Sequence, residues 1–202
     1  STILTQVTVD PYDESSYTPM KVVGRVMNAE EAKEEEAKGN FVVKEGDGYR
    51  RIVAAPKPVA IVEIDAIRAL ADADQPVIAA GGGGIPVMEQ GSHLKGASAV
   101  IEKDRAAGLL AKELDADVLM FITGVSNVVL NYGSDHPINI DKMTTADAAR
   151  YAEEGHFKTG SMLPKVESSI DFINAGKGRR AIITSLDGAK SALAGKGGTT
   201  IQ

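Results

Sequence analysis

Short, continuously apolar runs alternate with segments of helical periodicity from Val59 to the end of the chain. The runs are typical of strands buried on both faces and occupy residues 76–80, 118–122 and 180–184. A last strand is expected over residues 198–201. Apolar residues spaced three or four apart predict helices at 62–74, 104–116, 144–154, 164–175 and 187–193. This alternation predicts an α/β fold with a mainly parallel sheet that helices cover on both faces. Ligands of such sheets bind beyond the carboxyl ends of the strands.

The region before Val59 is more polar. Residues 28–38 predict an exposed acidic helix, with Asn28 as its N-cap, and a hairpin is expected between the runs 41–44 and 49–53. Residues 10–58 have little apolar content for a core of their own. We therefore expect them to form a protruding lid subdomain.

The first nine residues are rich in β-branched side chains and predict a strand over Thr2–Val9. A domain rarely begins inside a strand, because that strand must find a partner. We expect residues 1–9 to continue a missing N-terminal half of a longer protein. The remaining residues, 59–202, are then expected to form a nucleotide-binding α/β domain.

Composition narrows the function. The 202 residues carry a net charge of −6, which argues against a nucleic-acid partner, and no apolar run is long enough to span a membrane. The chain contains no cysteine, so thiolate catalysis and cysteine metal sites are excluded. Its three histidines, His93, His136 and His156, do not have metal-ligand spacing, and His156 is expected to help end a helix.

Three loops carry the candidate chemistry, of which the first and third follow predicted strands and the second follows the apolar pair Val100-Ile101. The first is Gly81-Gly82-Gly83-Gly84, whose backbone can approach a ligand closely, although a flexible turn is the alternative. In the second, Lys103 can hold a phosphate, and Asp104 can orient the lysine or merely cap a helix. The third begins with Thr123-Gly124, which suits a nucleotide edge or a turn, and Tyr132 follows it.

The segment 159–165, Thr-Gly-Ser-Met-Leu-Pro-Lys, is the strongest single signal. Pro164 is expected at the first helical position, with Lys165 in the first turn. Backbone donors and partial positive charge at a helix N-terminus, together with a lysine, make an anion site. Two lysines, Lys103 and Lys165, combined with backbone amides suit phosphoryl transfer, in which catalysis is mainly alignment and charge stabilisation.

Read in order, these motifs resemble those of carbamate kinases. The resemblance rests on G-G-G-G-I-P, V-I-E-K-D, T-G-V…N-Y-G, E-E-G-H-F-K-T-G-S-M-L-P-K and A-I-I-T-S-L. It extends to T-Q-V-T-V-D, K-V-V-G, G-D-G-Y-R-R-I-V and A-P-K-P nearer the start, and so covers nearly the whole chain. The family's N-terminal G-G-N and H-G-N-G-P loops are not in this sequence.

The resemblance implies the amino-acid kinase fold, a three-layer αβα sandwich. It also implies reversible phosphoryl transfer between ATP and carbamate, giving ADP and carbamoyl phosphate. Working toward ATP, such an enzyme would serve arginine- or purine-derived carbamoyl catabolism. A cytoplasmic homodimer that uses Mg²⁺ is expected, with no nucleic-acid or membrane partner.

The resemblance also implies residue roles. Lys103 and Lys165 would neutralise the transferred phosphoryl group, Asp104 would position the lysines, and Lys21 would reach in from the lid. The Gly81–Gly84 backbone would line the site. The nucleotide would be bordered by Thr123, Gly124, Tyr132, Gly160, Ser161, Met162 and Lys165. No protein ligand for a metal is assigned.

The chain departs from the family pattern at Glu102, where Asp is common, at Ala55, and in the lid motif around Lys21-Val22.

Two other functions stay open. One is a non-catalytic nucleotide- or anion-binding paralogue, or a fragment of such a kinase. The other is a carboxylate kinase such as acetylglutamate kinase, against which the 10–58 insertion and G-S-M-L-P-K argue. The 202 residues alone are expected to be inactive and poorly soluble.

Overall fold

The computed structural model describes residues 1–202, which divide into two compact units. The first unit comprises residues 1–63 and 77–103, and the second comprises residues 64–76 and 104–202. This division differs from the predicted domain at 59–202. The reason is strand pairing, since the segments around residues 58–61 and 85–90 both pair with the first strand.

The first unit contains a mixed four-stranded sheet in the order β5-β1-β6-β7. Its central pair, β1 and β6, is parallel, and the outer pairs are antiparallel. The strands are β1 (Gln6–Val9), β5 (Pro58–Ile61), β6 (Ile85–Gln90) and β7 (His93–Gly96), and two short 3₁₀ turns are η1 (Glu14–Ser16) and η2 (Gly81–Gly83).

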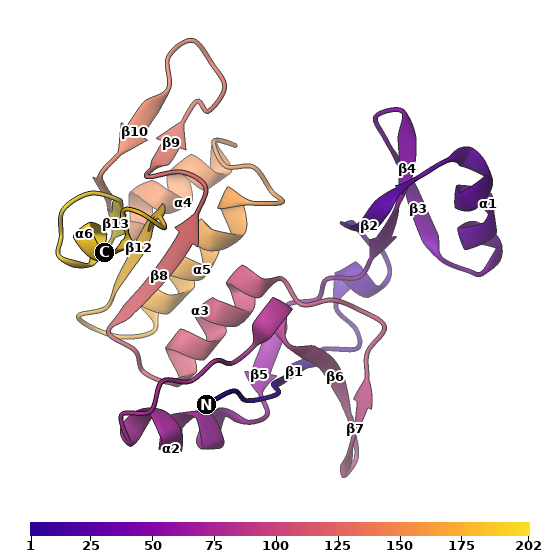
Figure 1. The fold of residues 1–202 in the computed structure, drawn as a ribbon, viewed down its shortest axis with the longest axis horizontal. Coiled ribbons are helices and arrows are strands. Elements are labelled where there is room, and N and C mark those ends of the chain that lie inside the picture. Colours follow the sequence, from indigo (N-terminus) through magenta and orange to yellow (C-terminus); the bar gives the residue numbers. More distant parts are fainter. The chain divides into compact units, whose positions relative to one another are not determined.

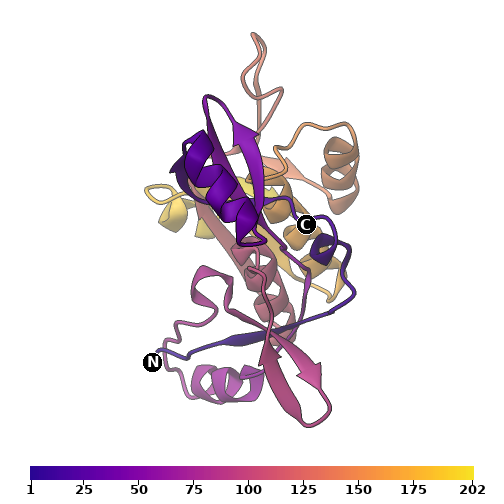
Figure 2. The ribbon, with the colours of Figure 1, turned by 90° about the vertical axis from the view of Figure 1, so that its right-hand side faces the viewer.

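A smaller lobe of the first unit is a three-stranded antiparallel sheet in the order β2-β4-β3, with one helix against it (Figures 1 and 2). Its elements are β2 (Lys21–Met27), α1 (Ala29–Ala37), β3 (Phe41–Glu45) and β4 (Gly48–Val53). The predicted helix and hairpin are confirmed. Asn28 and Glu31 form the capping box that starts α1. Whether residues 10–58 act as a lid stays a prediction.

The second unit is built around another mixed sheet, in the order β11-β13-β12-β8. The strands are β8 (Val118–Thr123), β11 (Lys142–Met143), β12 (Arg180–Ser185) and β13 (Thr199–Ile201), and a separate hairpin pairs β9 (Val128–Leu130) with β10 (Ile138–Ile140). The helices are α2 (Ile64–Asp72), α3 (Lys103–Glu113), α4 (Thr145–Glu153), α5 (Met162–Asn174) and α6 (Ala189–Leu193).

The central strand β12 is buried on both faces, as its unbroken apolar run predicts. Ala181 and Ile183 lie with Leu119 and Phe121 of β8 in one core, which also holds Phe172 of α5. The alternate residues of β12 point to the other face, where Thr184 approaches the chain around α6. Figure 1 shows β8 and β12 side by side with α5 against them.

Two sequence predictions need correction. The run 76–80 is not a strand: Ile78 makes a single bridge to Thr2, and 67% of its surface is exposed. Its backbone hydrogen bonds, from the Ile3 N–H to the Ile78 carbonyl and from the Ile78 N–H to the Ser1 carbonyl, form one bridge and no ladder. The strand expected over Thr2–Val9 is accordingly shortened to β1.

The helices α3 and α5 approach each other very closely. A Cβ atom on Gly108 of α3 would lie 2.8 Å from the Cβ of Ser168 on α5. Glycine costs a helix roughly 1 kcal/mol relative to alanine. Here it permits a helix crossing that no larger residue allows.

We predict that Gly108→Val lowers the free energy of unfolding by about 2 kcal/mol, because the added methyl groups force α3 away from α5. Chemical denaturation measures the change. Lys112→Val, on the exposed side of the same helix, controls for the helix propensity of valine and should cost less than about 1 kcal/mol. Equal losses in the two variants would show that the crossing tolerates bulk.

Candidate functional site

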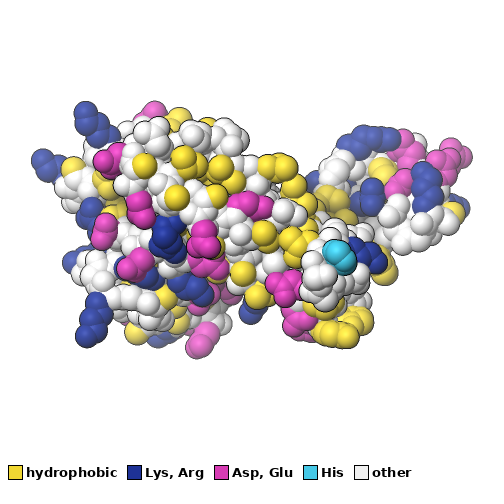
Figure 3. All heavy atoms as spheres, turned by 90° about the horizontal axis from the view of Figure 1, so that it is seen from below, with side chains coloured by type: hydrophobic (Ala, Val, Ile, Leu, Met, Phe, Trp, Pro, Cys, Tyr) yellow, Lys and Arg dark blue, Asp and Glu magenta, His cyan; other side chains and the backbone are white.

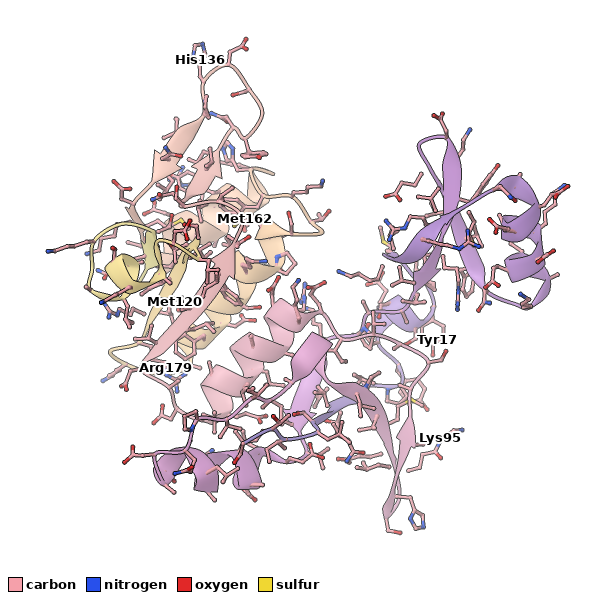
Figure 4. All side chains as sticks on the ribbon, viewed as in Figure 1. Tyr17, Lys95, Met120, His136, Met162 and Arg179 are labelled. Atoms are coloured by element: carbon pink, nitrogen blue, oxygen red, sulfur yellow. The ribbon has the colours of Figure 1, made fainter.

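The second unit contains a cavity of about 410 Å³ at the carboxyl end of β8. The predicted residues that line it come from the turn after β8, from the β9–β10 connection and from the start of α5: Thr123, Gly124, Tyr132, Ser161, Met162 and Lys165. Met162 is labelled in Figure 4. Gly160 is part of the same loop but does not line the cavity. The cavity therefore lies where the α/β pattern places a ligand.

Lys165, which lines this cavity, belongs to a buried ion pair. Lys165 Nζ donates to Asp104 Oδ2 at 2.8 Å and to the Ser161 carbonyl oxygen at 3.3 Å. Only 7% of Lys165 and 5% of Asp104 is exposed. Lysine and aspartate are rarely buried so fully unless they are paired, because burial of an isolated charge costs several kcal/mol. The ammonium is thus held in place by a carboxylate from the first turn of α3.

The start of α5 differs from the prediction. The helix begins at Met162, so Pro164 is its third residue and not its first. Proline fits there because no N–H of the first turn has a partner within the helix. The Lys158 carbonyl accepts from the Ser161 and Leu163 N–H groups, which leaves the Met162 N–H without a backbone acceptor. The helix terminus therefore offers fewer donors to an anion than the sequence suggested.

The remaining predicted lysines belong to the first unit and meet at Glu102. Lys21 of β2 donates to Glu102 Oε2, and Lys103 Nζ lies 3.4 Å from Glu102 Oε1. Burial acts to raise the pKa of the Glu102 carboxyl, but the hydrogen bond and charge of Lys21, with the charge of Lys103, lower it overall below its usual 4.5. The carboxylate is therefore ionised at neutral pH and holds both lysines.

Two of the four glycines in the Gly81–Gly84 turn are required by close packing. A Cβ on Gly83 would lie 2.4 Å from the Ile101 carbonyl oxygen, and one on Gly84 would lie 2.6 Å from Val7. Gly81 and Gly82 meet nothing within 4 Å, and neither N–H has a backbone acceptor. Two glycines thus permit close packing against Ile101 and Val7, and the other two leave donors available to a ligand.

The structure adds residues that sequence reasoning did not assign to the site. The first is Glu102, for which the sequence shows only a departure from the family pattern and a position directly after the apolar pair Val100-Ile101. The cavity is also lined by Val125, Asn127, Val129, His156 and Lys158. His156 follows Gly155 at the end of α4, as predicted, and its Nε2 lies 3.3 Å from Glu154.

No group of three or more His, Cys, Asp or Glu side chains that could hold a metal ion is found among residues 1–202. None of the helices combines the length and apolar character needed to cross a membrane. On the face drawn in Figure 3, acidic and basic side chains are interspersed, without a basic block of the kind that nucleic acids bind.

Comparison with known proteins gives the class. The sequence profile of the Amino acid kinase family matches residues 20–185. The chain belongs to the amino acid kinase family, as its motifs predicted. Its α/β fold is that family's fold, and the prediction of fold class is confirmed.

Within this family the chain is similar to carbamate kinases. It is 48% identical over 203 residues to the carbamate kinase-like protein YqeA of Escherichia coli, covering 100% of this chain and 65% of that protein. It is 46% identical over 202 residues to the carbamate kinase of Clostridium perfringens, covering 99% of this chain and 64% of that protein. The chain thus spans about 65% of the length of these relatives.

A solved structure agrees. Carbamate kinase from Giardia lamblia bound to AMP-PNP superposes with a TM-score of 0.91 at 40% identity, covering 99% of this chain and 64% of that one. The predicted resemblance to carbamate kinases is therefore confirmed in both sequence and structure.

We predict that Asp104→Ala lowers the free energy of unfolding by about 3 kcal/mol, because it leaves the Lys165 ammonium buried without its carboxylate. Denaturant titration of the purified variant measures this. Asp104→Leu combined with Lys165→Met removes both charges and should recover most of the loss. A single variant that costs less than about 1 kcal/mol would contradict the assignment of a buried pair.

A second prediction concerns how the contribution of Glu102 to folding stability depends on pH. A carboxyl whose pKa is lowered on folding contributes stability above its unfolded pKa and loses it as pH falls through the folded value. The stability difference between wild type and Glu102→Gln should therefore be constant near neutral pH and shrink below 4.5. Thermal melts from pH 7 downward test it. A difference that grows on acidification would contradict the ion cluster.

Proposed function

We propose that this chain carries the nucleotide-binding part of a carbamate kinase, which transfers a phosphoryl group reversibly between ATP and carbamate. The observation that carries the proposal is a cavity beyond a strand end that is lined by Lys165, a buried lysine paired with Asp104. Relatives named carbamate kinase, one of them bound to AMP-PNP, support the same activity.

The two groups of residues suit two halves of the reaction. In the second unit, Thr123, Gly124 and Met162 would border the nucleotide, and Tyr132, 74% exposed, offers an aromatic face for a base. The Lys165 ammonium would meet the charge that develops on the transferred phosphoryl group. A fixed cation in a water-poor site stabilises such charge far better than a cation in water.

The first unit would serve the carbamoyl phosphate side. Lys21 and Lys103 converge on one carboxylate, so their ammonium groups are held near each other without needing a ligand. Gly81 and Gly82 would add backbone donors to the same anion. In this proposal the Glu102 carboxylate keeps both lysines oriented, and the phosphate oxygens supply the countercharge.

Magnesium is proposed to arrive with the nucleotide. The residues lining the cavity include no carboxylate, and Asp104 is already paired with Lys165. They therefore do not form a magnesium site made by the protein alone, and no residue is assigned as a ligand. In nucleotide sites Mg²⁺ is commonly held by phosphate oxygens and water, where it neutralises phosphate charge.

Further features of the proposal come from the resemblance alone. They are operation toward ATP synthesis, a place in arginine- or purine-derived carbamoyl catabolism, and a cytoplasmic homodimer. A non-catalytic nucleotide-binding paralogue is the second candidate. The observation in its favour is that one relative, 48% identical, is named a carbamate kinase-like protein.

We predict that a polypeptide of the relatives' full length containing this chain makes ATP from ADP and carbamoyl phosphate. Lys165→Ala or Lys103→Ala should each lower kcat by roughly 100-fold, since each removes charge stabilisation of the transition state. A coupled assay for ATP measures both. Lys177→Ala, at an exposed position after α5, is the control and should be normal.

The result decides between the two candidates. Near-normal turnover in both lysine variants would overturn the assigned roles. Nucleotide binding without any turnover would favour the non-catalytic paralogue.

A further inference from the structure

Some basic side chains that line the cavity of the second unit are already paired with acidic side chains. Lys165 is already balanced by Asp104 at 2.8 Å. His156 lines the same cavity, but its Nε2 lies 3.3 Å from Glu154 Oε2, and its ring meets Tyr151 edge-on. Two of the three basic residues that line the cavity thus have an acidic partner.

Lys158 is the third basic residue, and it differs from the other two. It is exposed, it lines the cavity, and its ammonium makes no ion pair or hydrogen bond within residues 1–202. No Asp or Glu is among the residues that line the cavity. Lys158 therefore supplies the uncompensated positive charge of this site.

Backbone hydrogen bonds of Lys158 limit the region that its ammonium group can reach. Its carbonyl accepts from Ser161 and Leu163, so the residue is tied to the first turn of α5. That turn also carries the unpaired Met162 N–H and the helix N-terminal dipole, both of which favour an anion. A lysine side chain has a flexible four-carbon stem, so from this anchor its ammonium can reach an anion bound at the helix terminus.

We propose that Lys158 binds the phosphate groups of the nucleotide and so selects nucleoside diphosphates and triphosphates over the uncharged nucleoside. The proposal rests on the proposed function, since it assigns the same cavity to a nucleotide. It adds a second cation with a different task. Lys165 is buried and held by its carboxylate, whereas Lys158 contributes an exposed charge that attracts and retains phosphate.

The test uses isothermal titration calorimetry on the 202-residue chain, with ADP and adenosine as separate ligands. At about 50 mM salt, Lys158→Gln should raise the Kd for ADP roughly fivefold, as expected for one partly exposed charge contact, and leave the Kd for adenosine unchanged. At about 0.5 M salt the effect on ADP should fall below about twofold, because salt screens exposed charges.

Two variants control the experiment. Lys158→Arg keeps the charge and should bind ADP within about twofold of wild type. Lys177→Gln removes an exposed lysine just beyond the other end of α5, about 20 Å away along a helix of 13 residues, and should change neither Kd. Circular dichroism confirms that each variant is folded.

Each other outcome overturns the proposal. If Lys158→Gln binds ADP as wild type does, the phosphates do not use Lys158, and the proposed function is untouched. If Lys158→Gln raises the Kd for ADP and the Kd for adenosine by the same factor, Lys158 acts on the shape of the cavity and not through its charge. If wild type binds neither ligand at millimolar concentration, the proposed function of this cavity fails together with the inference.

Discussion

The seam between α3 and α5 is the constraint on which the site depends. Asp104 and Lys165 pair at the start of the two helices, and one turn further Gly108 meets Ser168 at a distance that only glycine allows. A third contact, Arg105 to Glu167 at 2.7 Å, lies on the same seam. Because the helices approach so closely, water is kept from the ion pair. The Lys165 ammonium is therefore buried, oriented and adjacent to a cavity at once.

Neighbouring residues at the start of α3 serve two different clusters. Lys103 lies beside Glu102, which also holds Lys21, whereas Asp104 turns to Lys165. The two compact units of the chain meet in sequence between these residues. Each unit therefore holds a lysine ammonium beside a carboxylate of its own, Lys103 with Glu102 in the first unit and Lys165 with Asp104 in the second. The proposed division of the reaction between the units follows from this arrangement.

Much of the second unit could be predicted from its sequence, and less of the first. The apolar runs of β8 and β12 and the periodicity of α3, α4 and α5 are local signals, and the structure confirms the strands and helices that they predict. The prediction of a strand at 76–80 was wrong because this apolar run pairs only through a single bridge to Thr2. No local sequence pattern reveals the length of a pairing partner. Likewise Pro164 marked a helix start, but only the structure shows that the Lys158 carbonyl caps it. The residue types and spacing indicate Lys103, Asp104 and Lys165 as charged residues at strand and helix ends, whereas Glu102 acts through a contact with the distant Lys21 that spacing does not encode.

The central claim is that the second unit holds a nucleotide against the buried lysine at the start of α5. Chemical-shift mapping by NMR, with ADP titrated into the ¹⁵N-labelled 202-residue chain, tests it most directly because it reports each backbone amide separately. The account predicts saturable shifts at Thr123, Gly124 and Met162, and unchanged amides in the three-stranded lobe and at Lys177. Shifts confined to other surfaces, or no saturable shift at Met162, would contradict it.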